Sequence, residues 1–184
     1  MTSDTLELRA TLTSARVQGT LVRVYSSVES GWAEGFVVDI GRDSLLLCLI
    51  ADLIVYNGFQ AMRLADLSEV QAPAPHAEFV ERALALRNET RPPDPPVDLS
   101  SLESLLWSAS AIFDLVTIHR EVVDPGVCYI GSVETIGREG VTLRTLDADA
   151  RWDEEREIVP LDDITRVDFG GLYEAALSSV SAAG

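Results

Sequence analysis

Residues 35–47 read GFVVDIGRDSLLL and residues 131–143 read GSVETIGREGVTL, so the same pattern returns 96 positions later without a gap. Six of the thirteen aligned positions are identical, and the pairs Asp43/Glu139 and Leu45/Val141 are conservative. Self-similarity at a fixed spacing is the sequence signature of repeated structural units. We therefore interpret the chain as a tandem duplication in which each copy forms one small supersecondary unit.

The similarity continues on both sides of this stretch. Residues 22–25 correspond to 116–119, residues 64–70 to 161–167, and residues 79–84 to 172–177, where a short helix is expected to close each copy. We place the first repeat at 1–86 and the second at 99–184. Residues 87–98 contain four prolines, which neither continue a helix nor donate to a strand ladder, so this segment is predicted to be an extended and fairly stiff linker.

Apolar and β-branched runs predict five short strands in each copy. In the first copy we expect strands at 21–26 and 35–40, a glycine-led hairpin turn at 41–44, and later strands at 59–64 and 68–71. The second copy has its turn at 137–140 and its later strands at 156–161 and 165–168. Ser100 or Ser101 offers an N-cap for a helix that precedes the second set of strands, and residues 5–17 have a weaker version of that pattern.

These elements resemble a known fold family. A leading helix, five strands, a glycine early in the second strand and an apolar-Asp-Ile-x-x-Val ending are similar to the Sm-like or SH3-like small β-barrel, here in two copies. The second copy, with CYIG at 128–131 and ITRVDFG at 164–170, also resembles bacterial proteins of uncharacterised function. The resemblance implies a mainly β fold of two five-stranded barrels flanked by short helices, acting as a binding module that is often oligomeric.

The charge balance limits the classes of partner. Thirty acidic residues face fourteen basic ones, all arginine, for a formal net charge of −16. Nucleic-acid affinity comes mostly from cationic side chains, so this charge argues against a nucleic-acid partner. Without lysine, Schiff-base chemistry and a Walker-type phosphate loop are excluded. No window has the apolar length of a membrane span, and the N-terminus lacks the basic region of a secretory signal, so we expect a cytoplasmic location.

The first copy contains an apolar hairpin between its third and fourth strands, residues 49–59, with an Asn-Gly pair that favours a turn at positions 57–58. This hairpin has two interpretations. Its side chains either fill the barrel or form an intermolecular contact. The candidate interface residues are Leu49, Ile50, Leu53, Val55, Tyr56 and Phe59.

The equivalent region of the second copy, residues 147–157, places six carboxylates around one tryptophan. That composition suits a divalent cation or a basic peptide, but the regular ligand alternation and closing glutamate of a calcium loop are absent. The alternative is a solvated loop anchored by its tryptophan. The candidate ligand-loop residues are Asp147, Asp149, Trp152, Asp153 and Glu154.

Catalytic patterns are sparse. The two histidines are His76 and His119, and His119 occupies a position equivalent to Tyr25, which favours a partly buried structural histidine. Cys48 and Cys128 lie at non-equivalent positions with the flanks of buried strand residues, which disfavours a disulfide or a metal role. A Cys128–His119 nucleophile pair is conceivable on adjacent strands, but no oxyanion site or orienting group accompanies it. We expect no catalytic residue, no cofactor and no bound metal.

Three functional hypotheses follow from the sequence. The favoured one is a non-enzymatic protein-interaction module that pairs with itself or with another protein through strand edges and the apolar hairpin. The second is an Sm-like RNA-binding protein, which would require a concentrated arginine rim on the surface. The third is a metal-dependent regulator or unrecognised enzyme, which would require His119, Cys128 and the acidic loop to converge on one cleft.

Overall fold

The computed structural model describes residues 3–183 and contains, in that range, ten β-strands and four short α-helices. The prediction of a mainly β fold with short helices is confirmed. The chain divides between Asp94 and Pro95 into two compact units, here called the first and the second unit. Within the described residues, every helix is too short or too polar to cross a lipid bilayer.

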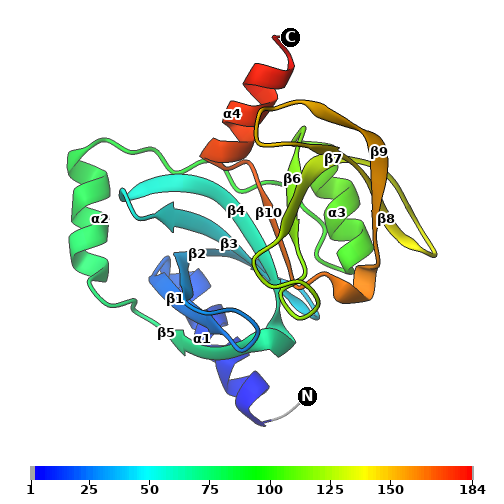
Figure 1. Cartoon of the computed structure of the whole chain (residues 1–184). Coiled ribbons are helices and arrows are strands. Elements are labelled where there is room, and N and C mark those ends of the chain that lie inside the picture. Colours follow the sequence, from blue (N-terminus) through cyan, green and yellow to red (C-terminus); the bar gives the residue numbers. More distant parts are fainter. Residues whose placement is uncertain (1–2, 184) are drawn as a thin grey trace. The chain divides into compact units, whose positions relative to one another are not determined.

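The first unit begins with a helix and ends with a helix, and its five strands form one antiparallel sheet with the order β5-β1-β2-β3-β4. A single 3₁₀ turn, η1 (Leu64–Asp66), separates the last two strands. Strands of this unit, β4 among them, are visibly curved (Figure 1). The elements are α1 (Ser3–Gln18), β1 (Leu21–Ser26), β2 (Trp32–Ile40), β3 (Ser44–Ala51), β4 (Val55–Arg63), β5 (Leu67–Gln71) and α2 (Ala77–Leu86).

The second unit has the same kinds of element in the same order, and its sheet has the order β10-β6-β7-β8-β9, which matches the first strand for strand (Figure 1). Ser101 caps the first helix by accepting a hydrogen bond from the Ser104 backbone N–H at 3.0 Å, as the sequence predicted. The elements are α3 (Leu102–Ser110), β6 (Val116–His119), β7 (Cys128–Gly137), β8 (Gly140–Leu146), β9 (Trp152–Val159), η2 (Leu161–Asp163), β10 (Arg166–Phe169) and α4 (Leu172–Ser181).

The two sheets also share their irregularities. The β2–β3 register shifts between Val37 and Asp39, and the β7–β8 register shifts between Val133 and Thr135, 96 positions later. The two glycines at the start of the repeat are required by close packing. A Cβ on Gly35 would lie 2.4 Å from the Cys48 carbonyl oxygen, and one on Gly131 would lie 2.3 Å from the Arg144 carbonyl oxygen. Each glycine therefore lets a neighbouring strand approach closely.

Each unit has its own apolar core. In the first unit, Leu12 and Ala15 of α1 pack on the sheet through Val24, Leu45 and Leu47. On the other side, α2 packs through its buried positions Ala77, Val80 and Leu84 on Leu21 and Phe36. In the second unit, Leu115, Leu146 and Leu177 form a cluster, and Leu106, Ile118 and Leu143 are fully buried.

The segment between the units, residues 87–98, has no regular secondary structure. Its beginning packs on the first unit, because the Arg91 guanidinium lies 5.5 Å from the centre of the Phe36 ring and forms a 2.7 Å ion pair with Asp94. Its end belongs to the second unit, where Val97 is buried. The proline-rich stretch is thus divided, with its first part in the first unit and its last part in the second.

The prediction of a turn at Asn57-Gly58 is wrong. The chain turns at residues 52–54, and Asn57 and Gly58 lie inside β4. The β3–β4 register shifts opposite them, from Cys48↔Phe59 to Ile50↔Tyr56, and Gly58 has a φ of 70°. Glycine in this left-handed conformation is typical of a β-bulge, so the dipeptide kinks a strand where the sequence suggested a reversal.

Candidate functional site

Strand β9 is the outer strand of the second unit's sheet, next to β8 (Figure 1). Five of its eight residues are exposed, and its backbone is paired with β8 along one side only. The register shifts between Arg144 and Leu146, so residues 153–155 have no paired position on β8. The strand therefore presents a ladder edge with unpaired backbone groups.

The side chains along this edge are mostly acidic. Asp153 Oδ2 accepts a hydrogen bond from Thr145 Oγ1 at 2.8 Å. No ion pair or side-chain hydrogen bond within residues 3–183 engages the carboxylates of Glu154, Glu155 and Glu157. Arg156, the basic residue of the strand, donates from Nε to Glu134 Oε2 at 2.7 Å. Three carboxylates on one exposed edge are thus without a cation.

The other residues of the candidate ligand loop have structural roles. Asp147 Oδ1 accepts hydrogen bonds from the backbone N–H groups of Asp149 and Arg151, both at 2.9 Å, and so shapes the turn between β8 and β9. Trp152 packs against the cluster of Leu115, Leu146 and Leu177, and the Arg144 guanidinium lies 4.6 Å from the centre of its ring. The tryptophan thus anchors the loop. Among the described residues, no group of His, Cys, Asp and Glu side chains is arranged to hold a metal ion.

The apolar hairpin of the first unit is largely packed within that unit. Ile50, Ile54 and Tyr56 contact the cluster that includes Phe36 and the buried face of α2, and Leu49 contacts the cluster under α1. Phe59 is buried and Val55 is half-buried. Leu53, at the turn, is 77% exposed, and its carbonyl oxygen accepts a hydrogen bond from Arg87 at 2.6 Å. Of the six candidate interface residues, Leu53 alone is exposed.

A buried ionic cluster lies where β6 meets β10, and it is built by His119, Glu121, Arg166 and Asp168. The side chains of Glu121 and Arg166 are 8% and 15% exposed, and the Arg166 Nε lies 3.5 Å from Glu121 Oε1 and 3.4 Å from Asp168 Oδ2. Neither carboxylate oxygen of Glu121 has a hydrogen bond. The guanidinium therefore lies between two carboxylates in a largely dry environment and forms an ion pair with each of them.

The His119 ring lies between an acidic and a basic side chain. Its Nε2 lies 3.2 Å from Asp168 Oδ2, and the Arg166 NH2 lies 2.9 Å from its Nδ1. A neutral ring with its proton on Nε2 satisfies both contacts, because Nε2–H donates to the carboxylate and Nδ1 accepts from the guanidinium. This arrangement stabilises the β6–β10 pair and occupies both ring nitrogens.

Sequence reasoning singled out His119 but missed its partners. The signal was present in the repeat, since Tyr25 pairs with Glu69 in the first unit where His119 pairs with Arg166 in the second. Comparing the paired positions of the two copies would have revealed an exchange of charge at the same place in the ladder. The apolar–polar periodicity alone does not show this exchange of charge, because apolar and polar residues alternate in the same way in both copies.

The two cysteines are free thiols with different surroundings. Cys48 is buried, and this desolvation raises its pKa from 9.0 to about 11, although Arg91 acts in the opposite direction. Cys128 was expected to be buried but is exposed, because it is the first residue of β7. Partial burial nevertheless raises the pKa of its thiol. It lies opposite His119 in the ladder, but a raised pKa disfavours the thiolate that nucleophilic catalysis requires.

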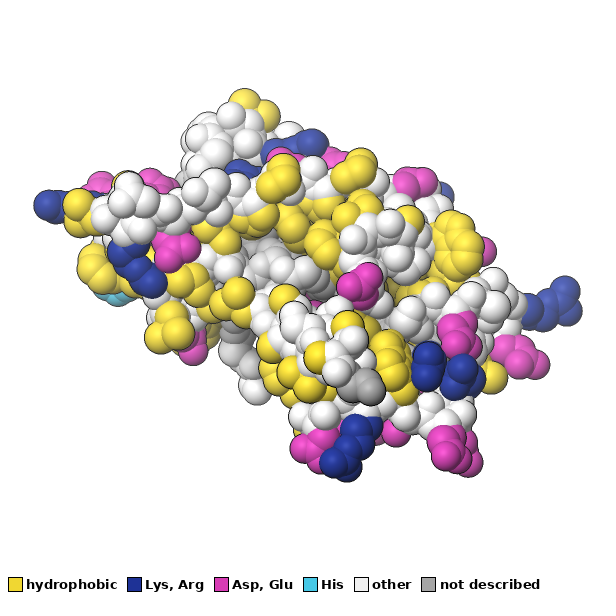
Figure 2. All heavy atoms as spheres, turned by 90° about the horizontal axis from the view of Figure 1, so that it is seen from above, with side chains coloured by type: hydrophobic (Ala, Val, Ile, Leu, Met, Phe, Trp, Pro, Cys, Tyr) yellow, Lys and Arg dark blue, Asp and Glu magenta, His cyan; other side chains and the backbone are white. Residues whose placement is uncertain are grey.

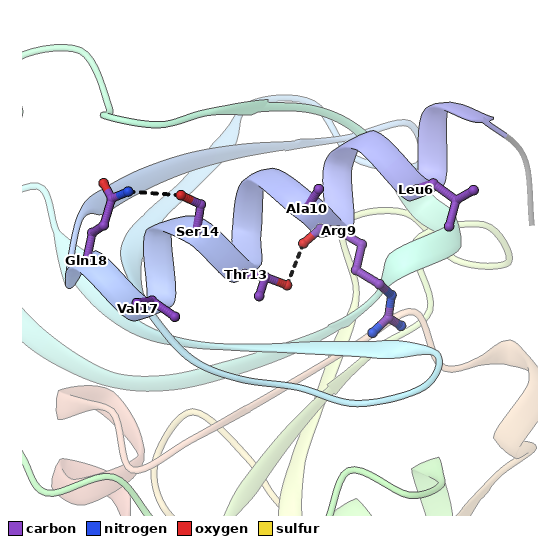
Figure 3. Close-up of a pocket in the computed structure, with 7 residues that line it drawn as sticks. All are labelled: Leu6, Arg9, Ala10, Thr13, Ser14, Val17 and Gln18. Carbon is purple, nitrogen blue, oxygen red and sulfur yellow. Dashed lines mark hydrogen bonds between the residues drawn. The ribbon is translucent and has the colours of Figure 1, made fainter.

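The outer face of α1 forms a shallow depression of about 560 Å³ (Figure 3). Its polar groups are already paired: Thr13 Oγ1 donates to the Arg9 carbonyl oxygen at 2.8 Å, Gln18 Nε2 donates to Ser14 Oγ at 3.0 Å, and the Arg9 guanidinium donates to the Gly41 carbonyl oxygen at 2.8 Å. One helix supplies the entire lining, so this is a helix surface and not an enclosed binding cavity. The lining residues are Leu6, Arg9, Ala10, Thr13, Ser14, Val17 and Gln18.

The arginines on the face shown in Figure 2 do not gather into a rim. In the face shown in Figure 2, the basic side chains form separate spots, several of them beside acidic ones. The contacts explain this distribution, because most arginines form an ion pair with a nearby carboxylate, for example Arg16 with Asp39 at 2.7 Å and Arg23 with Glu34 at 2.8 Å. An arginine that is already paired with a carboxylate attracts a phosphate only weakly.

A comparison of the chain with protein-family models, with curated proteins and with solved structures finds no match.

Proposed function

We propose that this chain is a tandem duplication of two small Sm-like or SH3-like barrels that serves as a non-enzymatic protein-interaction module, with an outer strand to which a partner adds its own strand. The observation that carries the proposal is the β9 edge, which is exposed and has ladder groups paired on one side only. An extended segment that adds to such an edge gains main-chain hydrogen bonds along its length.

The duplication is supported by features that composition alone would not repeat. The element order and the strand order recur in the two units. The register shift after Val37 and Val133 and the close-packed Gly35 and Gly131 recur at an offset of 96 residues. Small barrels of this class commonly serve as binding scaffolds, which is why we place the activity in the edges and not in a catalytic centre.

Two observations favour this proposal over the alternatives. His119 has both ring nitrogens engaged and the thiol of Cys128 has a raised pKa, so the residues that an enzyme would use are not poised for reaction. The paired arginines and the net charge of −16 oppose binding to an RNA backbone. A protein partner, unlike an RNA backbone, can bind an acidic surface.

The test compares Glu155→Pro with Glu155→Ala. Both remove one carboxylate, but only proline removes a backbone N–H, and Glu155 lies where β9 has no paired position on β8, so the sheet itself should survive. Immobilised wild type and both variants are exposed to extract from the native host, and retained proteins are quantified by mass spectrometry. Light scattering on the eluted peak of size-exclusion chromatography reports self-association.

A partner, or a second copy, that is retained by wild type and by Glu155→Ala but lost from Glu155→Pro supports strand addition. If the retained proteins and the molar mass are the same for all three chains, strand addition at β9 is overturned. Circular dichroism of each variant shows whether the fold is intact.

A further inference from the structure

The charge pattern of β9 bears on the chemistry of its partner. Glu154, Glu155 and Glu157 are free carboxylates on a strand whose only basic residue, Arg156, is already paired with Glu134. A strand added beside β9 would place its side chains about 5 Å from these groups. At that distance opposite charges attract and like charges repel, so the edge selects its partner by charge as well as by backbone pairing.

A second copy is a poor occupant of this edge. Antiparallel pairing of β9 with β9 of another molecule would set glutamates against glutamates, and like charges directly opposite one another destabilise a strand pair. Each molecule also has a net charge of −16, which slows the encounter of two copies at low salt. The acidic edge therefore protects the protein from pairing with itself.

An apolar side chain at the end of the strand completes the pattern. Ile158 is 48% exposed, and it shares a face of β9 with Arg156, whereas Val159 on the opposite face is fully buried. A partner strand that alternates basic and β-branched residues places its basic residues beside the glutamates of one face and its β-branched residues beside Ile158 on the other. The surface is thus complementary to an extended, basic segment with alternating apolar positions.

We propose that the β9 edge binds an extended basic segment of a different protein, with main-chain pairing along β9 and cationic side chains on Glu154, Glu155 and Glu157. This inference rests on the proposed function, because it assumes strand addition at β9 and names the partner's chemistry.

The test uses four labelled seven-residue peptides and the full chain, with binding followed by fluorescence anisotropy. The basic peptide alternates lysine and valine, the neutral one threonine and valine, and the acidic one glutamate and valine. The fourth is the basic peptide with every backbone nitrogen N-methylated, which keeps the charge but removes the backbone donors of both strand edges. We expect the basic peptide to bind about tenfold more tightly than the neutral one, with ion pairs to the carboxylates on one face of β9 contributing, and to weaken as salt is raised.

Matched variants locate the site. Glu154→Gln, Glu155→Gln and Glu157→Gln together should weaken the basic peptide about tenfold. Glu7→Gln, Glu78→Gln and Glu81→Gln together change the net charge equally, but they alter exposed positions of the first unit and should leave the affinity unchanged. A loss in both triple variants would indicate general charge attraction and overturn the inference.

The peptide series separates the two proposals. If the neutral peptide binds as tightly as the basic one and N-methylation abolishes binding, strand addition stands and the basic partner is rejected. If the N-methylated peptide binds as well as its parent, strand addition itself is rejected, and with it the inference. Absence of binding by all four peptides rejects both.

Discussion

In the first unit Tyr25 pairs with Glu69, and in the second unit His119 pairs with Arg166 at the same place in the ladder. The fourth strands of the two units differ as well, since β4 is mostly buried and apolar whereas β9 is exposed and acidic. The buried positions of the sheets are far more alike: Leu47 and Leu143 are both fully buried. The two units are thus alike in these interior positions and differ at these ladder and strand positions, which is where a difference in binding would arise.

The largest effect should come from the shared interior. Leu47→Ala and Leu143→Ala each leave a cavity under a sheet, and each should lower the free energy of unfolding by about 2–5 kcal/mol. Urea denaturation monitored by circular dichroism measures the loss, and two transitions are expected if the units unfold separately. Leu53→Ala, at a 77% exposed position, is the control and should have almost no effect. A large loss for Leu143→Ala but none for Leu47→Ala would break the equivalence of the two cores.

The second prediction concerns the diverged ladder position. Arg166→Ala removes the guanidinium between Glu121 and Asp168 and leaves two largely buried carboxylates without it, at a cost of about 3 kcal/mol. Glu69→Ala, at the equivalent position of the first unit, removes an exposed side chain hydrogen-bonded to Gln71 and should cost about 0.5 kcal/mol or less. Equal losses in the two variants, measured by urea denaturation, would show that the cluster adds no stability.

The third prediction tests the repeated glycines. A methyl group at Gly35 or Gly131 would overlap a carbonyl oxygen of the next strand, so Gly35→Ala and Gly131→Ala should each destabilise their unit by about 1–3 kcal/mol. Gly137 is a matched control, because a Cβ there meets nothing within 4 Å and its backbone is not in the left-handed region. Thermal unfolding that shifts equally for Gly131→Ala and Gly137→Ala would contradict the packing role of the repeated glycine.

The repeat made the mainly β fold predictable, because a strand, a glycine turn and a second strand recur with their apolar positions in step. Local sequence patterns gave a wrong prediction where the same residues are compatible with two different backbone structures. Asn57-Gly58 favours a hairpin turn as much as a bulge, and only the flanking pairs Phe59–Cys48 and Tyr56–Ile50 show that it forms a bulge. The ionic cluster was missed because His119 and Arg166 are 47 residues apart, and nothing local shows that two strands bring them together.

The last prediction is a pH dependence of the first unit. Cys48 occupies the position that Arg144 holds in the second unit, opposite the second residue of the repeat. Burial raises the pKa of the Cys48 thiol from 9.0 to about 11, so the folded chain keeps a proton that the unfolded chain releases. This stabilisation is complete below pH 9 and is lost as the pH rises toward 11. Urea denaturation between pH 8 and pH 11 should show a decline that is smaller in Cys48→Ala than in wild type. An identical decline in both chains would mean that the thiol stays neutral in the unfolded state or ionises without cost in the folded one, and the first unit would then lack this difference from the second.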